Sequence, residues 1–304
     1  MELNTLLQYK PYSTARTEKR ALYAGLLTGL TQFHRERCPE YGRLLDALGC
    51  PAHMDCTVES TPMLPVSLFK ELELRSIPEG EVFKTITSSG TTGQRVSRIF
   101  LDGATSACQQ QALCQIMSDF LGERRLPFLV LDSRQVLRNR AMFSARGAGI
   151  LGFSIFGTRP CYALDEHMEL DLDGVRAFLE EHQGETIFLF GFTFIIWKHV
   201  VRALEERGER LDIPNGILVH GGGWKKLAGE AVSPGEFKAR VAAATGVERV
   251  SNYYGMAEQT GCIYMECPQG HLHASLWSDI VVRRGRDYRP CEPGEEGVLQ
   301  VLSP

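Results

Sequence analysis

From residue 126 onward, the chain alternates continuous apolar runs with amphipathic segments. The apolar runs are LPFLVLD at 126–132, ETIFLFG at 185–191 and NGILVHGGG at 215–223. Short runs of this kind predict strands of a parallel sheet that is covered on both faces. Helix-like patterns lie between and after these runs at 173–182, 194–207 and 234–244, and the last leads into VERVSNYYG. This alternation predicts an α/β fold with a largely parallel sheet flanked by helices.

The sequence before residue 126 predicts two helices and one short strand. The first helix covers 17–34, with apolar residues at helical spacing: Leu22, Leu26, Leu30 and Phe33. The second covers 104–121, with an apolar face made of Leu113, Ile116, Met117 and Phe120. Pro, Cys and Thr residues predict a loop at 50–66, and VFKTIT predicts a strand. At the other end of the chain, GEEGVLQVLSP predicts a turn followed by a strand.

Composition and charge exclude several classes of protein. The 304 residues are 43% apolar and 23% charged, which is typical of a soluble chain with a substantial core. The net charge of −4, from 33 Lys and Arg against 37 Asp and Glu, provides no basic excess for nucleic acid or an anionic membrane. The N-terminus lacks a signal-peptide pattern, and the most apolar run, 187–201, is too short and polar to span a bilayer. Nine scattered cysteines fit reduced thiols, so we expect a cytoplasmic protein without membrane insertion.

Six small residues, SSGTTG at 88–93, follow the predicted strand VFKTIT. Glycines let backbone amides approach an anion closely, and hydroxyl groups add donors, so this pattern predicts a phosphate-binding loop. It is not a P-loop, because the GxxxxGK[ST] pattern with its lysine is absent. Arg95 and Arg98 lie just beyond it. The alternative is a surface turn rich in serine and glycine.

A second glycine-rich loop, VHGGGWKK, covers 219–226. Three glycines after a buried strand indicate that a flat or bulky group approaches the backbone closely. A nucleobase could hydrogen-bond to this backbone, and a lysine after Trp224 could reach a phosphate. The alternative is a glycine turn that packs on a neighbouring helix, with its lysines in solvent.

The third loop, SNYYGMAEQTG at 251–261, combines aromatic rings with a carboxylate. Tyr254 can stack on a base, and Glu258 is suited to bind Mg²⁺ beside phosphates. The alternative is a pair of buried tyrosines with a solvated glutamate. Together, in this chain order, the three loops predict an ATP site that activates a carboxylate.

These loops carry a resemblance to a known family. TSSGTTG and YYGMAE resemble the two signature loops of the adenylate-forming enzymes, which include acyl-CoA synthetases, luciferases and peptide-synthetase adenylation domains. Within that group the chain most resembles the acyl-protein synthetase (LuxE) branch, which is related to phenylacetate–CoA ligases. The similarity runs from roughly residue 60 to the end, on the phrases LPVSLFKE (64–71), FSARGAG (143–149), FGFTFIIWK (190–198), HGGGWKKL (220–227), NYYGMAEQTG (252–261) and GVLQVLSP (297–304).

The resemblance implies the large N-terminal domain of the adenylate-forming fold. Residues 61–304 would form the ATP- and acyl-binding core, and residues 1–60 a helical segment that packs on it. The ribose-binding aspartate and the C-terminal lysine of the family are expected beyond residue 304, so the C-terminal part of the family fold is expected to be missing here.

The implied reaction has two steps. A carboxylic acid, by expectation a fatty acid, attacks ATP and gives acyl-AMP and pyrophosphate, and the acyl group then passes to a cysteine thiol of a protein. In the luminescence system the next partner is a fatty-acyl reductase. Two alternatives stay open: an aryl- or acyl-CoA ligase of the phenylacetate type, and a non-catalytic adenylation-like module that binds an acyl ligand or a partner.

The resemblance also implies residue roles. The ATP phosphates would be bound by Ser88, Ser89, Gly90, Thr91, Thr92 and Gly93, and the adenine pocket would be lined by Gly221, Gly222 and Gly223. The tyrosine loop would add Asn252, Tyr253, Tyr254, Gly255 and Met256, with Tyr254 stacked on the adenine. The implied catalytic residues are Glu258 (which would hold Mg²⁺), Thr91 and Lys225. The acid would contact Phe192, Phe194, Trp197 and His220.

The chain departs from the family pattern at two positions within these loops. Gln94 and Arg95 stand where the phosphate loop usually ends near a lysine, and Ala257 stands where a threonine usually precedes the glutamate. Gln259 or Thr260 would supply the lost donor.

Cysteines and histidines leave three further questions open. A zinc site could use Cys262, Cys267, His271 and His273. The alternative is that the cysteines are buried and the histidines belong to a polar loop. An acyl thioester could form on Cys161, Cys262 or Cys267. His220 either orients the carboxylate or caps a strand.

Overall fold

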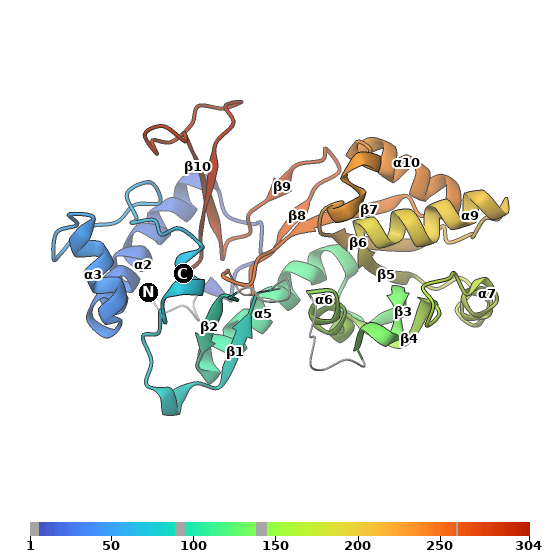
Figure 1. Ribbon diagram of the computed structural model, residues 1–304, viewed down its shortest axis with the longest axis horizontal. Coiled ribbons are helices and arrows are strands. Elements are labelled where there is room, and N and C mark those ends of the chain that lie inside the picture. The colour runs from blue at the N-terminus through green and yellow to red at the C-terminus, as the bar shows by residue number, and fades with distance from the viewer. Residues whose placement is uncertain (1–5, 89–94, 138–144, 260) are drawn as a thin grey trace. The chain divides into compact units, whose positions relative to one another are not determined.

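The computed structural model describes residues 6–88, 95–137, 145–259 and 261–304, without the side chains of Ala145, Lys225 and Lys226. The chain divides into two compact units (Figure 1). Unit 1 comprises Met1–Asp119, Gly255–Tyr264 and Ala274–Pro304, and unit 2 comprises Phe120–Tyr254 and Met265–His273. Among the described residues, no helix is long and apolar enough to cross a membrane.

Unit 2 is built on a seven-stranded sheet of order β4-β3-β5-β6-β7-β8-β9. Its strands are β3 (Leu126–Ser133), β4 (Gly157–Leu164), β5 (Ile187–Phe192), β6 (Gly216–Gly221), β7 (Arg249–Tyr254), β8 (Tyr264–Glu266) and β9 (Leu272–His273). The pairs β4–β3, β3–β5, β5–β6 and β6–β7 are parallel, and β8–β9 is antiparallel. Every residue of β5 and of β6 is buried, as the continuous apolar runs predict.

Helices cover both faces of this sheet. They are η2 (Arg134–Leu137), α6 (Ala145–Phe153), η4 (Ser154–Phe156), α7 (Leu172–Glu181), α8 (Thr193–Ile195), η5 (Ile196–Val201), α9 (Arg202–Arg207), η6 (Lys225–Glu230) and α10 (Pro234–Thr245). Figure 1 shows α6 on one side of the strands and α9 and α10 on the other. Ion pairs join α7 to the segment after α9 through Arg176 and Glu209, and α9 to α10 through Glu205 and Arg240.

Local chemistry sets the ends of the helices that flank the sheet. The side chain of Asp171 accepts a hydrogen bond from the Gly174 amide at the start of α7, and Ser233 caps α10 in the same way ahead of Pro234. Gly246, with φ of 74°, ends α10 in the left-handed conformation that glycine adopts readily.

The α6 face of the sheet is packed with aromatic rings. Phe128 and Phe188 are paired in register on β3 and β5 and stack with their ring centroids 4.8 Å apart. Phe153 of α6 stacks on Phe190 at 4.3 Å. These rings fix α6 against the carboxyl-terminal half of β5.

Unit 1 holds the remaining elements. Its helices are α2 (Arg16–Arg37), α3 (Pro39–Ala47), α4 (Leu68–Glu71) and η1 (Glu79–Glu81), with α5 (Gly103–Leu121) up to Asp119. Two antiparallel hairpins complete it: β1 (Lys84–Thr87) with β2 (Arg98–Leu101), and β10 (Asp279–Arg283) with β11 (Val298–Leu302).

The buried stripe of α2 differs by one residue from the predicted stripe. The helix itself is confirmed, but its buried residues are Lys19, Tyr23, Leu27 and Thr31, whereas Leu22, Leu26 and Leu30 are half-buried beside them. The pattern of hydrophobic residues alone does not predict this buried face, because two of its positions are the polar residues Lys19 and Thr31. Lys19 is accommodated because it donates hydrogen bonds to the carbonyl oxygens of Ser275 and Ser278.

The first small-residue loop does not belong to the parallel sheet. The strand before it, β1, pairs with β2 in an antiparallel hairpin of unit 1. Its base is closed by Ser88, whose amide donates to the carbonyl oxygen of Ser97 at 3.2 Å, while the Ser97 amide donates to Oγ of Ser88 at 2.9 Å.

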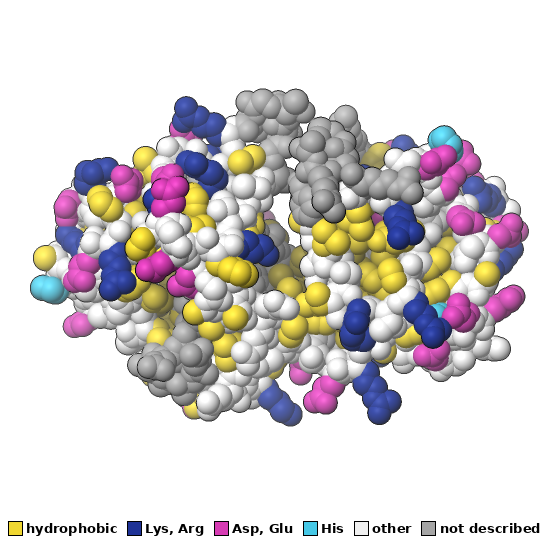
Figure 2. Space-filling model, turned by 90° about the horizontal axis from the view of Figure 1, so that it is seen from below, with side chains coloured by type: hydrophobic (Ala, Val, Ile, Leu, Met, Phe, Trp, Pro, Cys, Tyr) yellow, Lys and Arg dark blue, Asp and Glu magenta, His cyan; other side chains and the backbone are white. Residues whose placement is uncertain are grey.

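Acidic and basic side chains are interspersed on the face shown in Figure 2, where Lys and Arg lie among Asp and Glu. This mixture agrees with a net charge close to zero for a chain of this length.

Candidate nucleotide and substrate site

The carboxyl ends of β5, β6 and β7 bring several predicted site residues together. In the parallel register, Phe192 pairs with Gly221 and Gly221 pairs with Tyr253. One position earlier, Gly191 pairs with His220 and His220 with Asn252. Because paired residues share a face and neighbours along a strand alternate, Phe192 and Tyr253 lie on one face and His220 and Asn252 on the other.

Two of the three glycines in the loop are required by rings of the chain itself. A Cβ on Gly221 would lie 2.8 Å from Cζ of Tyr253, and a Cβ on Gly222 would lie 3.0 Å from Cδ1 of Phe192. Gly222 also has φ of +77°, which side chains rarely adopt. A Cβ on Gly223 would have no atom within 4 Å. The described contacts therefore explain why residues 221 and 222 are glycines, but they do not explain the glycine at 223.

Phe192 and Tyr253 belong to the aromatic layer under α6. Phe153 lies 5.0 Å from Tyr253 and Phe192 lies 5.9 Å from Phe190, measured between ring centroids. A Cβ on Gly149 of α6 would lie 3.0 Å from Cζ of Phe192. Tyr254, the next residue on β7, is instead 42% exposed. This exposure agrees with the predicted stacking on a base, which stays a prediction.

His220 is buried on the opposite face and is held by Thr193. The Thr193 hydroxyl donates to the carbonyl oxygen of Gly221 at 3.2 Å and lies 2.9 Å from Nδ1 of His220. With the hydroxyl hydrogen directed to that carbonyl, Nδ1–H of the ring is the donor to Oγ1. Burial first, and the charge of Lys238 second, lower the pKa of His220 to about 3. The imidazole is therefore neutral at physiological pH.

Trp197 lies on the same side as His220, within an aromatic cluster centred on Phe237 of α10. Phe237 lies 4.6 Å from the His220 ring and 6.3 Å from Trp197, and Trp224 lies 5.3 Å from Trp197. Trp197 belongs to the π-helical turn η5, a rare conformation that is common at functional sites. The predicted walls of the acyl pocket are thus divided: Phe192 faces α6, Trp197 faces α10, and Phe194 is half-buried between them in sequence.

A buried ion pair supports the start of the tyrosine loop. Glu266 of β8, only 5% exposed, lies 3.0 Å from Nζ of Lys238 and accepts a hydrogen bond of 2.8 Å from the amide of Asn252. The carboxylate therefore connects α10 to β7 just before Tyr253 and Tyr254.

Glu258 lies in a tight turn of unit 1. The amide of Gln259 donates to the carbonyl oxygen of Met256 at 3.1 Å, which closes the turn around Ala257 and Glu258. Glu258 is half-buried, and among the described residues its carboxylate has no hydrogen bond or ion pair. A half-buried carboxylate that no described residue pairs with fits a ligand of a hard cation.

The described part of the chain contains no group of three or more His, Cys, Asp or Glu that could hold a metal ion. Cys267, His271 and His273, which all belong to unit 2, do not form such a group, so the structure gives no support to the zinc hypothesis for these residues and Cys262. For Mg²⁺ the same finding is compatible with one carboxylate, because this ion usually keeps water and phosphate oxygens as its other ligands.

The predicted phosphate loop is only described at its ends. Ser88 closes the base of the hairpin, while Ser89, Gly90, Thr91, Thr92 and Gly93 lie outside the described residues. The side chain of Lys225 is not described either. Beyond the loop, Arg95 pairs with Glu71 at 2.8 Å and Arg98 with Glu73 at 3.7 Å.

Two cysteines considered for an acyl thioester are poor nucleophiles. Burial first, and the charge of Asp171 second, raise the pKa of Cys161 to about 11. Burial also raises the pKa of Cys262 to about 11, although Ser303 and Lys19 act in the opposite direction. Since the thiolate is the reactive form, these thiols are less reactive than a free cysteine.

The contacts that support the site could not be read from the sequence. Thr193 and Gly149 lie in the phrases FGFTFIIWK and FSARGAG, but no pattern assigns either residue a role. Asp132 ends the apolar run LPFLVLD. Its buried carboxylate accepts hydrogen bonds from Arg146, which lies in FSARGAG, and one of these bonds is 2.9 Å long. A buried acid at the end of a strand and a basic residue in a glycine-rich helix were the available signals.

Comparison with known proteins gives concordant results. The chain is 20% identical over 304 residues to the long-chain-fatty-acid–luciferin-component ligase of Vibrio harveyi, covering 96% of this chain and 77% of that one. It shares its fold with an open conformation of 2-hydroxyisobutyryl-CoA ligase in complex with 2-HIB-AMP and CoA, with a TM-score of 0.66 and 15% identity. That match covers 98% of this chain and 66% of the ligase. The family model for the acyl-protein synthetase LuxE matches residues 2–304. The chain therefore belongs to the LuxE acyl-protein synthetase family.

Proposed function

We propose that this protein activates a carboxylic acid with ATP and transfers the acyl group to a cysteine thiol of a partner protein. A carboxylate oxygen attacks the α-phosphorus of ATP, the bond to the β-phosphate oxygen breaks, and pyrophosphate leaves. The sulfur of the acceptor then attacks the acyl carbonyl carbon, the thiol loses its proton, and AMP leaves. A fatty acid is the proposed substrate.

The observation that carries this proposal is the pairing of the glycine turn with the tyrosine loop. Gly221 pairs with Tyr253 at the carboxyl ends of neighbouring parallel strands, where ligands bind in open α/β sheets. Family membership supports the reaction class, and the Vibrio harveyi relative, a fatty-acid ligase by name, supports the acid.

Each loop has a proposed role in binding the nucleotide. The backbone at Gly223, where an added Cβ would have no described atom within 4 Å, would accept the edge of the adenine, and the exposed ring of Tyr254 would stack on it. Ser88 and the following loop residues would bind the phosphates, and Thr91 and Lys225 are the further residues proposed to act in catalysis. Arg95 and Arg98 could join them only by leaving Glu71 and Glu73.

Glu258 would hold Mg²⁺, since its carboxylate is half-buried and has no partner among the described residues. The bound ion would offset negative charge on the phosphates during the displacement. The contribution of the protein is then to orient the acid and the nucleotide and to exclude water.

An ATP–pyrophosphate exchange assay across a panel of acids tests this proposal. The panel should contain saturated fatty acids of eight to sixteen carbons, phenylacetate and 2-hydroxyisobutyrate. We expect exchange with the longer fatty acids, and its loss in Glu258→Gln with the fold unchanged by circular dichroism. Glu248→Gln changes an exposed glutamate of the loop before β7 and should exchange normally. An absence of exchange with every acid would refute the proposal.

The acceptor needs a separate assay. Radiolabelled acid and ATP are supplied with either CoA or a cysteine-bearing fatty-acyl reductase, and the label is followed on each. We expect label on the protein in a thioester that hydroxylamine cleaves. Label on CoA alone would instead assign the protein to the phenylacetate–CoA ligase type of activity.

A further inference from the structure

The residue after the proposed metal ligand is unusually well anchored. Gln259 is 5% exposed, and its Nε2 lies 2.7 Å from the hydroxyl oxygen of Tyr264. The same hydroxyl donates to Oε1 of Gln259 at 2.8 Å. Nε2 also donates to the carbonyl oxygen of Leu302 in β11 at 3.3 Å. Both the nitrogen and the oxygen of the buried Gln259 amide group are thus hydrogen-bonded. Two of the three bonds are to the Tyr264 hydroxyl, and the third is to Leu302.

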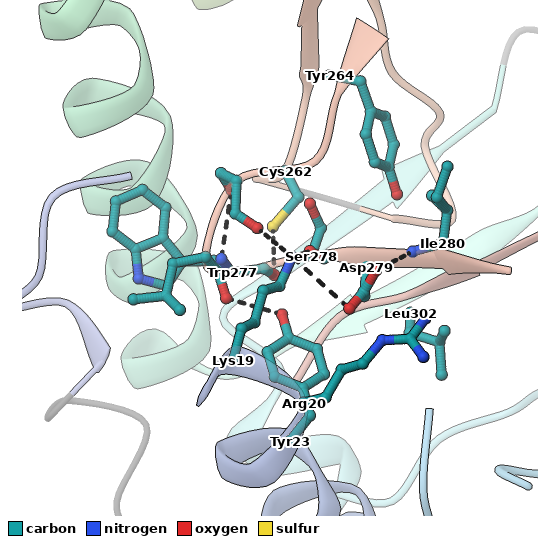
Figure 3. A network of polar contacts seen from close by, with 12 residues as sticks. Lys19, Arg20, Tyr23, Cys262, Tyr264, Trp277, Ser278, Asp279, Ile280 and Leu302 are labelled. Carbon is teal, nitrogen blue, oxygen red and sulfur yellow. Dashed lines mark hydrogen bonds and ion pairs between the residues drawn. The ribbon is translucent and has the colours of Figure 1, made fainter. Parts of the chain in front are cut away.

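The rest of this segment is held just as closely. Gly261 has φ of +77°, and a Cβ there would lie 2.6 Å from Cα of Gln109 in α5, so the segment packs backbone to backbone on that helix. The thiol of Cys262 donates to the carbonyl oxygen of Trp277 at 3.0 Å. Figure 3 shows Cys262, Tyr264 and Leu302 around the strand that begins at Asp279.

Glu258 has no such anchor of its own. It is half-buried, its carboxylate has no hydrogen bond or ion pair to any described residue, and it lies inside the turn that the Gln259 amide closes onto Met256. The position of Glu258 therefore depends on Gln259, the neighbouring residue whose side chain is fixed. A carboxylate that binds a cation must be placed to within about half an ångström, so a turn that is not held in place would bind the cation more weakly.

We propose that Gln259 and Tyr264 are positioning residues, which fix the Met256–Gln259 turn so that the Glu258 carboxylate can bind a divalent cation together with a nucleotide. This inference rests on the proposed function. It assigns to Gln259 a role different from the one expected from the sequence: with its amide group engaged by Tyr264 and Leu302, Gln259 acts through the turn and does not donate to the nucleotide.

Two substitutions remove the anchor from opposite sides. Gln259→Met keeps the length of the side chain and removes its amide group, and Tyr264→Phe removes only the hydroxyl. Two matched controls are Gln269→Met, an exposed glutamine of the β8–β9 turn, and Tyr288→Phe, a tyrosine that is 53% exposed. Thermal unfolding of each variant shows that it is folded at the assay temperature.

The direct measurement is binding of Mn²⁺ in the presence of α,β-methylene-ATP, followed by electron paramagnetic resonance. We expect the affinity for Mn²⁺ to fall about tenfold in each single variant and no further in the double variant, because the two changes remove the same anchor. KM for Mg·ATP in pyrophosphate exchange should rise while KM for the acid stays unchanged. Hydrogen exchange of the peptide 255–264 should accelerate in the same variants and not in the controls.

The outcomes separate this inference from the function on which it depends. If the unaltered protein neither binds Mn²⁺ with the nucleotide nor exchanges pyrophosphate, the proposed function fails and the inference fails with it. If the unaltered protein does both and the folded variants match it, the inference alone is overturned. An equal rise of KM for the acid and for Mg·ATP would likewise overturn it, since that marks a general structural loss. If Gln259→Met does not fold, Tyr264→Phe carries the test.

Discussion

The ring of Tyr253 lies across Gly221, its partner in the register of β6 and β7, where a Cβ would come within 2.8 Å of the ring. Tyr253 is in turn packed by Phe153 and Phe190 of the aromatic layer under α6. The glycine is therefore a condition for packing the two strands, independent of any ligand. Its neighbour two positions later, Gly223, has no such constraint.

The first prediction compares these two glycines. Gly221→Ala should destabilise the fold by about 1–3 kcal/mol, because the ring of Tyr253 must move within a packed layer. Gly223→Ala should change stability by less than about 0.5 kcal/mol but weaken ATP binding, because the methyl group would occupy the space proposed for the adenine. Urea unfolding and nucleotide titration measure the two effects. Equal losses of stability in both variants would contradict the assignment.

The second prediction concerns His220. Its pKa of about 3 in the folded state lies below the ordinary value of 6.5. Above pH 6.5 the ring is neutral in both states, and between 6.5 and about 3 the unfolded chain binds a proton that the folded chain does not. The free energy of unfolding should therefore decrease as the pH falls through that interval, by on the order of 5 kcal/mol in total.

The control for His220 is a side chain that does not titrate. In His220→Gln the part of the pH dependence due to this residue should disappear, which urea unfolding at several pH values between 3 and 7 would show. Lys238 and Glu266 are the charged groups near it and are left in place. If His220→Gln leaves the pH dependence of the free energy of unfolding unchanged, the His220 ring is not buried in its neutral form.

The third prediction concerns the buried lysine of α2. Lys19 is 8% exposed, donates to the carbonyl oxygens of Ser275 and Ser278, and lies 3.7 Å from Oδ2 of Asp279. Figure 3 shows its side chain reaching from α2 toward Ser278 and Asp279. Lys19→Met should destabilise the protein by about 3–5 kcal/mol, because a buried carboxylate and two carbonyl groups lose their donor.

A second substitution distinguishes the charge from the packing. Lys19→Met combined with Asp279→Leu should be less destabilised than the single variant, since it removes the unpaired carboxylate as well. Arg176→Met breaks an exposed ion pair with Glu209 and should cost less than about 1 kcal/mol. A double variant that loses stability additively would show that the two residues are not coupled.

The fourth prediction concerns the acyl group. Phe192 lies against Gly149 and Gly222, at the end of the strand, whereas the Trp197 ring is surrounded by Trp224, Phe237 and Arg240. Phe192→Leu should shift the acid preference in pyrophosphate exchange toward longer chains, because it opens space at the glycine loop. Trp197→Leu should lower stability by about 3–5 kcal/mol without that shift. A shift with Trp197→Leu alone would place the acid on the α10 face.

The pattern of the sequence predicted the parallel strands well because burial on both faces leaves continuous apolar runs. It failed where buried positions are polar. The strand β10 begins at Asp279 and ends at Arg283, which is 5% exposed and bonded to Gln300, Tyr288 and Glu59, so its charged ends concealed it. The buried Lys19 and Thr31 shifted the apparent stripe of α2 for the same reason.

For the candidate site, composition located the loops but could not say what fills them. The glycines at 221 and 222 indicated a close approach to the backbone, yet only the register reveals that the approaching groups are Tyr253 and Phe192. Thr193 has no signature of its own, and its role follows from the 2.9 Å contact with His220.

Lys19 and the two carbonyl groups that accept its hydrogen bonds are separated by 256 and 259 positions in the chain. During synthesis, α2 leaves the ribosome long before the residues that satisfy its buried lysine and tyrosine exist. Unit 2, made almost entirely from residues 120–254, can form its parallel sheet earlier. A nascent chain should therefore protect β3, β5 and β6 from protease first, and α2 should become resistant only once the β10–β11 hairpin has been made.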